Sequence, residues 1–286
     1  MSILESLVPL IGKILPFEWL QMEFMQQALV ALLLLVPMTG MMGVQVINFR
    51  MAFFSDAISH STFAGVALGL ILSISPHWSM PIFGLMVGFS IIACQRLSYL
   101  DNDTLIGVFF SGIMAIGLAL VSREKALARD LQRFLYGDVL TITKEEILLL
   151  MVLTAILFVF QFFAYNRMLY IGLNPMLANV HRVRVKFYQY AYAGLLSLVV
   201  VSAVNAVGVL LVTAMLMIPA ATARNLAKTA GSMFWWSLLL SLLSAVSGLY
   251  ISTQEWARTA TGATVVLVAF IFFMVSGVVA HFTRKF

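Results

Sequence analysis

The chain has 286 residues, of which 62% are hydrophobic and only 10% charged, and its mean hydropathy is +1.01. A soluble domain carries about 25% charged residues, so this composition excludes a soluble globular fold and indicates a polytopic membrane protein. The net charge of +5 is modest, and the basic residues fall mainly between apolar runs, which favours headgroup contacts over nucleic-acid binding. The single cysteine, Cys94, excludes an intrachain disulfide.

We expect one all-α transmembrane domain over residues 1–286 with about eight spanning helices, since a span needs about 20 apolar residues. Residues 1–22 alternate apolar and polar positions and predict a short interfacial segment instead. The sixth apolar run is too long for one straight crossing, and predicts a break, a steep tilt or a re-entrant portion, near residues 205–208 or at Pro219. The expected spans are 24–47, 53–73, 80–97, 104–121, 143–165, 187–219, 231–251 and 262–280.

Asp56 and His60 lie inside the second apolar run, residues 53–73. Residues four apart share one face of a helix. Ionisable groups in hydrocarbon cost roughly 2.5–3.5 kcal/mol or more unless something compensates them, so they are candidates for function. The compensating species we favour is a divalent metal ion in transit. Two other interpretations stay open: Asp56 caps the first turn of the helix, or the pair relays protons.

The ligand chemistry of this pair leaves the choice of metal open. Imidazole suits zinc and iron, whereas carboxylate oxygen suits manganese and other harder ions. Two ligands are too few for a closed tetrahedral site. Two copies of the chain around a two-fold axis would supply two carboxylates and two imidazoles, with Ser59 and Thr62 placed to help position them. Such an imperfect cage suits transport because the ion must leave it.

Gly65 and Gly69 follow the pair on the same predicted helix. Small residues four apart let helix backbones approach closely in membranes. They predict that the helix with Asp56 and His60 is packed tightly within the protein.

A basic interval separates the fifth and sixth runs. Asn174 followed by Pro175 is typical of a helix cap with proline at the first helical position. We expect a short helix of roughly a dozen residues within 174–186, carrying His181, Arg182 and Arg184. A helix across the ends of two spans is suited to docking on a partner, and an ordinary basic loop is the alternative.

Several motifs are absent from the sequence. It contains no G-x-x-x-x-G-K-[ST], so it binds no ATP through a P-loop. It also lacks H-E-x-x-H and G-x-S-x-G, which disfavours an intramembrane enzyme. One transport class that remains is an ion-coupled secondary transporter in which Asp56 and His60 relay protons or ions.

Five stretches together resemble the permease subunits of zinc/manganese/iron ABC importers. They occur in order over most of the chain. They are 55–60 (SDAISH) with Gly65 and Gly69, 103–107 (DTLIG), 134–140 (FLYGDVL), 208–212 (GVLLV) with 218–224 (IPAATAR), and 261–264 (TGAT).

The resemblance implies a homodimeric pore in the bacterial cytoplasmic (inner) membrane that works by alternating access. It implies a non-enzymatic subunit, an ATPase dimer that supplies the energy, and an extracytoplasmic metal-binding protein. Asp56 and His60 match the family's ion pathway, and the transported ion (zinc, manganese or iron) is not a permanent cofactor. Segment 174–186, with Asn174, Pro175, His181, Arg182 and Arg184, matches a cytoplasmic coupling helix.

The implied orientation puts segment 174–186 in the cytoplasm and both chain termini outside. With eight spans, however, only seven Lys and Arg fall on that side and ten on the other, so charge alone leans the opposite way.

The chain departs from the family pattern at two places. Ala64 stands where the family often has proline, and no acidic residue immediately precedes the TGAT motif, so Glu255 is only a weak candidate there. An ABC permease for a larger iron chelate or vitamin is a related alternative, but its wide pathway would not need a ligand pair in the span.

Overall fold

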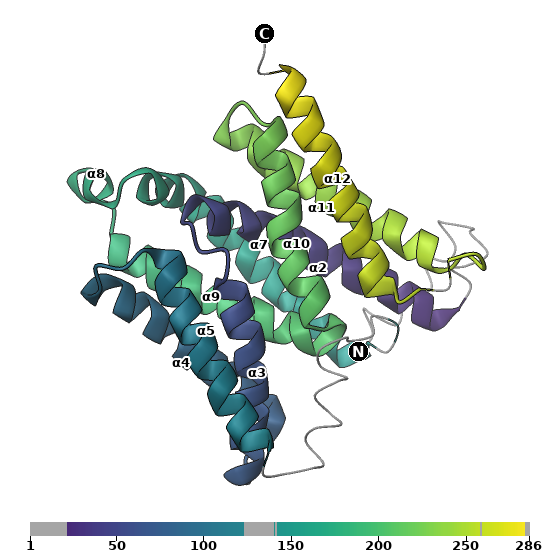
Figure 1. The fold of residues 1–286 in the computed structure, drawn as a ribbon, viewed down its shortest axis with the longest axis horizontal. Coiled ribbons are helices and arrows are strands. Elements are labelled where there is room, and N and C mark those ends of the chain that lie inside the picture. Colours follow the sequence, from purple (N-terminus) through teal and green to yellow (C-terminus); the bar gives the residue numbers. More distant parts are fainter. Residues whose placement is uncertain (1–21, 123–139, 141, 258, 284–286) are drawn as a thin grey trace.

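The computed structural model describes residues 22–122, 140, 142–257 and 259–283, and helices make up nearly all of this part of the chain. The interfacial segment predicted for residues 1–22 therefore lies almost wholly outside the described residues. Figure 1 shows the arrangement of the helices. They are α2 (Glu23–Asn48), α3 (Phe54–Ile71), α4 (Pro76–Leu97), α5 (Asn102–Val121), α7 (Lys144–Leu173), α8 (Pro175–Val180), α9 (Val185–Val207), α10 (Val209–Leu226), α11 (Ala230–Ser252) and α12 (Thr261–Thr283).

The long helices run back and forth between two ends of a bundle. At one end α2 and α7 begin side by side, where Lys144 Nζ lies 2.8 Å from Glu23 Oε1. At the other end α7 finishes against Asn48, and α8 follows. We call these the Glu23 end and the α8 end. α7 opens with the predicted capping box, in which the Thr143 hydroxyl accepts from the Glu146 amide.

The long sixth apolar run is two helices and not one. Gly208 adopts φ 87° and ψ 162°, a conformation open essentially to glycine alone, and it separates α9 from α10. The predicted break near residues 205–208 is therefore correct, whereas Pro219 lies inside α10. The Asn205 side chain donates to Glu146 at 3.1 Å, so the break lies at the Glu23 end and α10 returns toward α8.

This extra crossing corrects the predicted position of the C-terminal helix. α12 starts near the first turn of α10, where Gly262 approaches Leu211, and later Asn225 of α10 donates to Ser276 of α12 at 3.0 Å. α12 therefore ends at the α8 end, opposite the start of α2. The eight expected spans put the start of the first span and the end of the last on one side, and this is wrong because they counted α9 and α10 as a single span. The chain termini themselves lie outside the described residues.

The corrected path also changes the distribution of charge. Among the described residues, eight Lys and Arg lie at the α8 end and Lys144 lies at the Glu23 end, so the positive-inside rule favours a cytoplasmic α8 end. The eight are Arg50, Arg96, Arg167, Arg182, Arg184, Lys186, Arg224 and Lys228.

Eight helices of the described residues are long and apolar enough to cross a membrane. This agrees with the predicted number, although the set differs: α9 and α10 both qualify, and α3 does not. α3 is as long as α10, with 18 residues, but Asp56, His60 and four hydroxyl side chains lower its hydropathy. It can tolerate this polarity because 13 of its residues are buried by neighbouring helices.

The packing of α3 follows the predicted glycine face. A Cβ atom at Gly65 would lie 3.1 Å from the backbone of Met80, and one at Gly69 would overlap Ser79. Both contacts are with α4, so the two backbones approach closely along this face.

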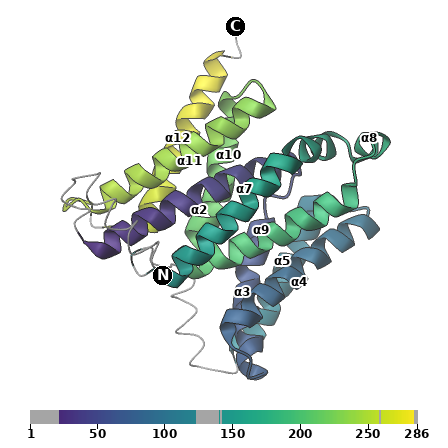
Figure 2. The ribbon, with the colours of Figure 1, turned by 180° about the vertical axis from the view of Figure 1, so that it is seen from behind.

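α3, α5 and α10 lie toward the viewer in Figure 1, while α2, α7 and α9 lie toward the viewer in Figure 2.

Candidate metal pathway

Asp56 and His60 occupy the one gap in the packing around the first three turns of α3. Of residues 54–64, all but these two are buried, and both are part-exposed. Their four-residue spacing puts them on the same side of the helix. The side chains therefore reach whatever space lies beside α3, while the rest of this helix segment is fixed by the protein.

The pair lies about halfway along the spans. A Cβ atom at Gly88, in the middle of α4, would lie 3.4 Å from Phe54 and 3.5 Å from Ile58 and would overlap Ser197, in the middle of α9. The first turns of α3 thus lie at the mid-height of two full-length helices. Substrate sites of membrane transporters commonly occupy this depth.

Two helices flank the pair. From α10, Thr213 lies beside the Asp56 carboxyl, and its hydroxyl donates to the Leu210 carbonyl at 3.5 Å. From α5, the ring of Phe110 meets His60 edge-on, with centroids 5.2 Å apart and an interplanar angle of 78°. The imidazole Nδ1 is buried and has no hydrogen-bond partner among the described residues. Sequence reasoning did not identify Thr213 or Phe110, because neither carries a local motif.

The other residues considered with the pair lie elsewhere. Ser59 and Thr62 are buried within the bundle, and the Thr62 hydroxyl donates to the Ser59 carbonyl. The described residues contain no group of three or more His, Cys, Asp or Glu that could hold a metal ion. Glu255 is therefore not brought to the pair, and one copy of the chain offers Asp56 and His60 as an incomplete ligand set.

α8 is shorter than predicted. Asn174 caps it as expected, because its Oδ1 accepts from the amides of Met176 at 2.8 Å and Leu177 at 3.2 Å, and Pro175 is its first residue. The helix has six residues and ends before His181. Arg182 has φ 58°, outside the helical region, so the dozen-residue helix expected within 174–186 is wrong.

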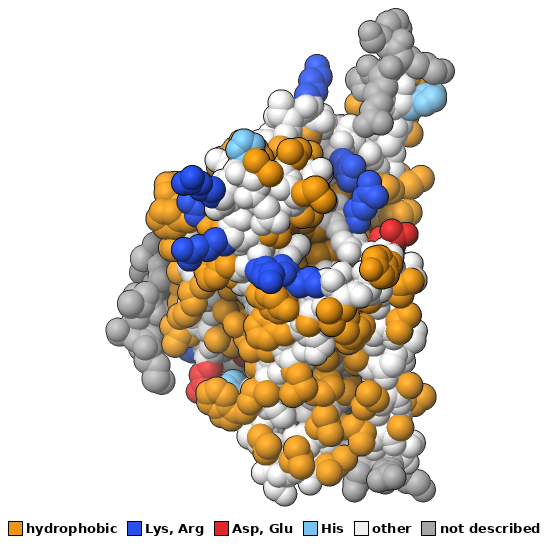
Figure 3. All heavy atoms as spheres, turned by 90° about the vertical axis from the view of Figure 1, so that its left-hand side faces the viewer, with side chains coloured by type: hydrophobic (Ala, Val, Ile, Leu, Met, Phe, Trp, Pro, Cys, Tyr) orange, Lys and Arg blue, Asp and Glu red, His pale blue; other side chains and the backbone are white. Residues whose placement is uncertain are grey.

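His181, Arg182 and Arg184 instead form the turn between α8 and α9. With Arg167 they line a hollow of about 410 Å³. Arg167 donates to the Tyr188 hydroxyl and lies 5.5 Å from the centre of that ring. The face of the molecule that includes α8 carries a band of Lys and Arg above a broad apolar surface (Figure 3).

Residues 21–280 match the model of the ABC 3 transport family. The chain belongs to the ABC 3 transport family. It is thus a multi-pass permease of the bacterial inner membrane. The match spans nearly all of the described helices, from α2 to α12. Membership does not favour the ion-coupled secondary transporter considered from the sequence, and it confirms the resemblance drawn from the five motifs.

Individual relatives are similar to this chain over almost its whole length. The high-affinity zinc uptake system membrane protein ZnuB of Haemophilus influenzae is 30% identical over 254 residues, covering 89% of this chain and 97% of that protein. The manganese import system permease protein ScaB of Streptococcus parasanguinis is 33% identical over 265 residues, covering 93% and 94%. The solved structure of PsaBC from Streptococcus pneumoniae aligns with a TM-score of 0.75 at 30% identity and 95% coverage of both chains.

Proposed function

We propose that this chain is the permease subunit of an ATP-driven importer for a divalent transition metal ion: zinc, manganese or iron. Two copies would form the pore, and the ion would pass between them by alternating access. The family match supports the transporter class, and the relatives named for zinc and manganese support a metal ion as cargo.

The observation that carries the proposal is the exposed pair on a buried helix. Asp56 and His60 are the two part-exposed residues in the first three turns of α3, at mid-height in the bundle. An ionisable pair at this depth needs compensation, and a cation bound by carboxylate and imidazole supplies it.

A second copy of the chain would complete the ligand set. One copy offers one carboxylate and one imidazole, and two copies would offer four ligands, the number that zinc commonly takes. The ion is substrate, held between the copies only during passage. Because the ligands come from two bodies that move relative to each other, their separation can change and release the ion.

The energy would come from a separate ATPase dimer at the α8 end. This end holds eight of the nine Lys and Arg among the described residues, which favours a cytoplasmic location. Asn174 and Pro175 fix the start of α8, and the turn bearing His181, Arg182 and Arg184 presents positive charge beside it. An extracytoplasmic metal-binding protein would then deliver the ion at the Glu23 end.

The test is ATP-dependent uptake by the reconstituted system. The chain is placed in vesicles with the ATPase subunit that co-purifies with it, and uptake of radioactive zinc, manganese and ferrous iron is measured. We expect uptake of at least one of these ions that stops when ATP is withheld. Uptake that needs no ATP and follows an imposed proton gradient would contradict the proposal and favour a secondary transporter.

A further inference from the structure

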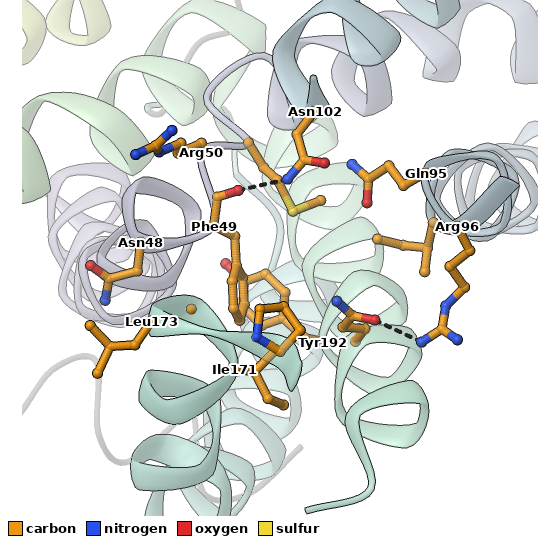
Figure 4. Close-up of a pocket in the computed structure, with 14 residues that line it drawn as sticks. Asn48, Phe49, Arg50, Gln95, Arg96, Asn102, Ile171, Leu173 and Tyr192 are labelled. Carbon is orange, nitrogen blue, oxygen red and sulfur yellow. Dashed lines mark hydrogen bonds between the residues drawn. The ribbon is translucent and has the colours of Figure 1, made fainter. Parts of the chain in front are cut away.

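Beside α8, a second hollow of about 420 Å³ opens at the same end of the bundle. Five segments meet around it: the turn after α2, the end of α4, the start of α5, the junction of α7 and α8, and the first turns of α9. It is separate from Asp56 and His60, which do not line it. Figure 4 shows its lining.

The lining is rich in hydrogen-bond donors. It includes Arg50, Arg96 and four residues with side-chain amides, and none of its residues is acidic. The Arg50 guanidinium points away from Gln95 and Asn102 (Figure 4). Arg96 is held in place: it donates to Gln189 Oε1 at 2.7 Å and lies 5.6 Å from the centre of the Tyr190 ring. These contacts leave further N–H groups of Arg96 available.

Gln95 adds a donor without a partner. Its Nε2 atom is buried and makes no hydrogen bond within the described part of the chain. In Figure 4 Gln95 and Asn102 point toward each other along one side of the hollow, with Arg96 below Gln95. Asn102 already donates to the Phe49 carbonyl at 2.9 Å. An oxyanion bound here would satisfy Gln95 and accept a charge-assisted bond from Arg96.

Exposed apolar residues lie beside the lining residues in sequence, at and beyond the ends of the spans. Leu97 is 84% exposed and Tyr99 fully exposed where α4 ends, and Leu173 is 84% and Met176 78% exposed at the junction of α7 and α8. Lipid chains cover the sides of spans and not the segments that connect them. Exposed apolar residues around a polar hollow instead favour a protein partner.

We propose that this hollow is a second docking point for the ATPase subunit, next to α8, and that it takes an acidic side chain of that subunit. The inference rests on the proposed function. The wall contributed by residues 48–51 leads directly into α3, and Phe49 of that turn packs edge-on against Tyr192 at 5.7 Å. A partner that docks here therefore contacts the turn that leads into α3, and can shift the helix that carries Asp56 and His60.

The experiment measures the affinity of the purified ATPase for the full-length permease in nanodiscs of phosphatidylcholine, which carry no anionic lipid. We expect Arg96→Glu to weaken binding about tenfold and Gln95→Leu about threefold. Arg96→Glu also removes contacts with Gln189 and Tyr190, whereas Gln95→Leu leaves them intact. If Arg96→Glu misfolds, the binding of Gln95→Leu therefore still tests the inference. Lys228→Glu, with the same charge change at the same end outside the hollow, should bind normally.

Unchanged binding by a folded Arg96→Glu and by Gln95→Leu would overturn the inference. So would an effect that appears only when phosphatidylglycerol is present and is accompanied by loss of co-purifying lipid, because the hollow would then be a lipid site. If the wild-type chain itself binds no ATPase, the proposed function fails. If the wild-type chain binds the ATPase and supports uptake, and both variants bind the ATPase with the same affinity, only the proposed docking point is wrong.

Discussion

The helix that carries Asp56 and His60 and the short helix α8 differ most in how far the protein covers them. Thirteen of the 18 residues of α3 are buried, against one of the six residues of α8, Ala178. Neighbouring helices therefore fix the position of α3 and leave mainly Asp56 and His60 accessible in its first turns. α8 is held by its cap and by a strained turn, and its exposed side chains are available to a partner protein. Substitutions in α3 should therefore impair metal binding, and substitutions beside α8 should impair coupling.

The largest effect is expected from the ligand pair. Asp56→Ala and His60→Ala should each lower metal uptake by more than about 100-fold, since loss of one partner of a buried charge costs about 3–5 kcal/mol. Assembly with the ATPase should be unchanged, because both side chains lie in the gap beside α3. Uptake of radioactive metal by vesicles measures the first result and co-purification of the ATPase the second.

Asp101→Ala and His77→Ala serve as matched controls, since these residues lie at helix starts away from the pair. They should transport normally. Normal uptake by both Asp56→Ala and His60→Ala would show that the transported ion does not bind this pair.

A smaller effect is expected at the turn after α8, where substitutions should impair coupling to the ATPase and leave metal binding intact. Changing Arg182 and Arg184 together to Glu should lower the metal transported per ATP hydrolysed by about tenfold, roughly 1.4 kcal/mol of coupling. Metal binding by the purified complex should stay normal, because the turn is remote from α3. Parallel assays of ATP hydrolysis and uptake measure the ratio. A double variant that couples as well as the wild type would mean that this turn is not the coupling surface.

The packing of α3 predicts an effect on stability. A Cβ atom in Gly69→Ala would overlap Ser79, and overpacking of this kind costs about 1–3 kcal/mol. The melting temperature in detergent should fall by about 2–4 °C for each kcal/mol. Gly112→Ala on α5, which has open space around it, should not lower it. Equal melting temperatures would show that the α3–α4 contact is looser than described.

The smallest effect is expected at Thr213. Thr213→Val removes the hydroxyl that meets the Asp56 carboxyl, and a hydrogen bond to a charged group contributes about 1.5–3 kcal/mol. Water can replace part of this in an open pathway, so we expect metal affinity to fall about threefold to tenfold. Thr213→Ser should restore most of it, and calorimetric titration of the complex distinguishes the two. If Thr213→Ser is as weak as Thr213→Val, the hydroxyl plays no part.

Local chemistry accounts for what the sequence predicted correctly. Asn174 with Pro175, and Thr143 with Glu146, are caps whose hydrogen bonds form within a few residues. Gly65 and Gly69 predicted the tight packing of α3 for the same reason: the absence of side chains is visible in the sequence. Gly208 was one of two possible breaks in an overlong run, and only its backbone conformation decides between them.

What the sequence did not predict depends on contacts between distant segments. Thr213 reaches Asp56 only because α10 turns back at Gly208 and packs against α3. α8 ends early, and Arg182 lies outside the helical conformation. No helix-ending residue such as glycine at this position predicts that end. The hollow beside Arg96 needs five segments to meet, and no local motif reports such a meeting.

X-ray absorption at the edge of the bound metal can show whether Asp56 and His60 are its ligands. The wild-type complex, loaded with the ion that it transports, should give the scattering pattern of imidazole nitrogen together with carboxylate oxygen at metal–ligand bond distances. His60→Ala should lose the imidazole pattern, or bind no metal. An unchanged imidazole signal in a metal-loaded His60→Ala complex would contradict the account.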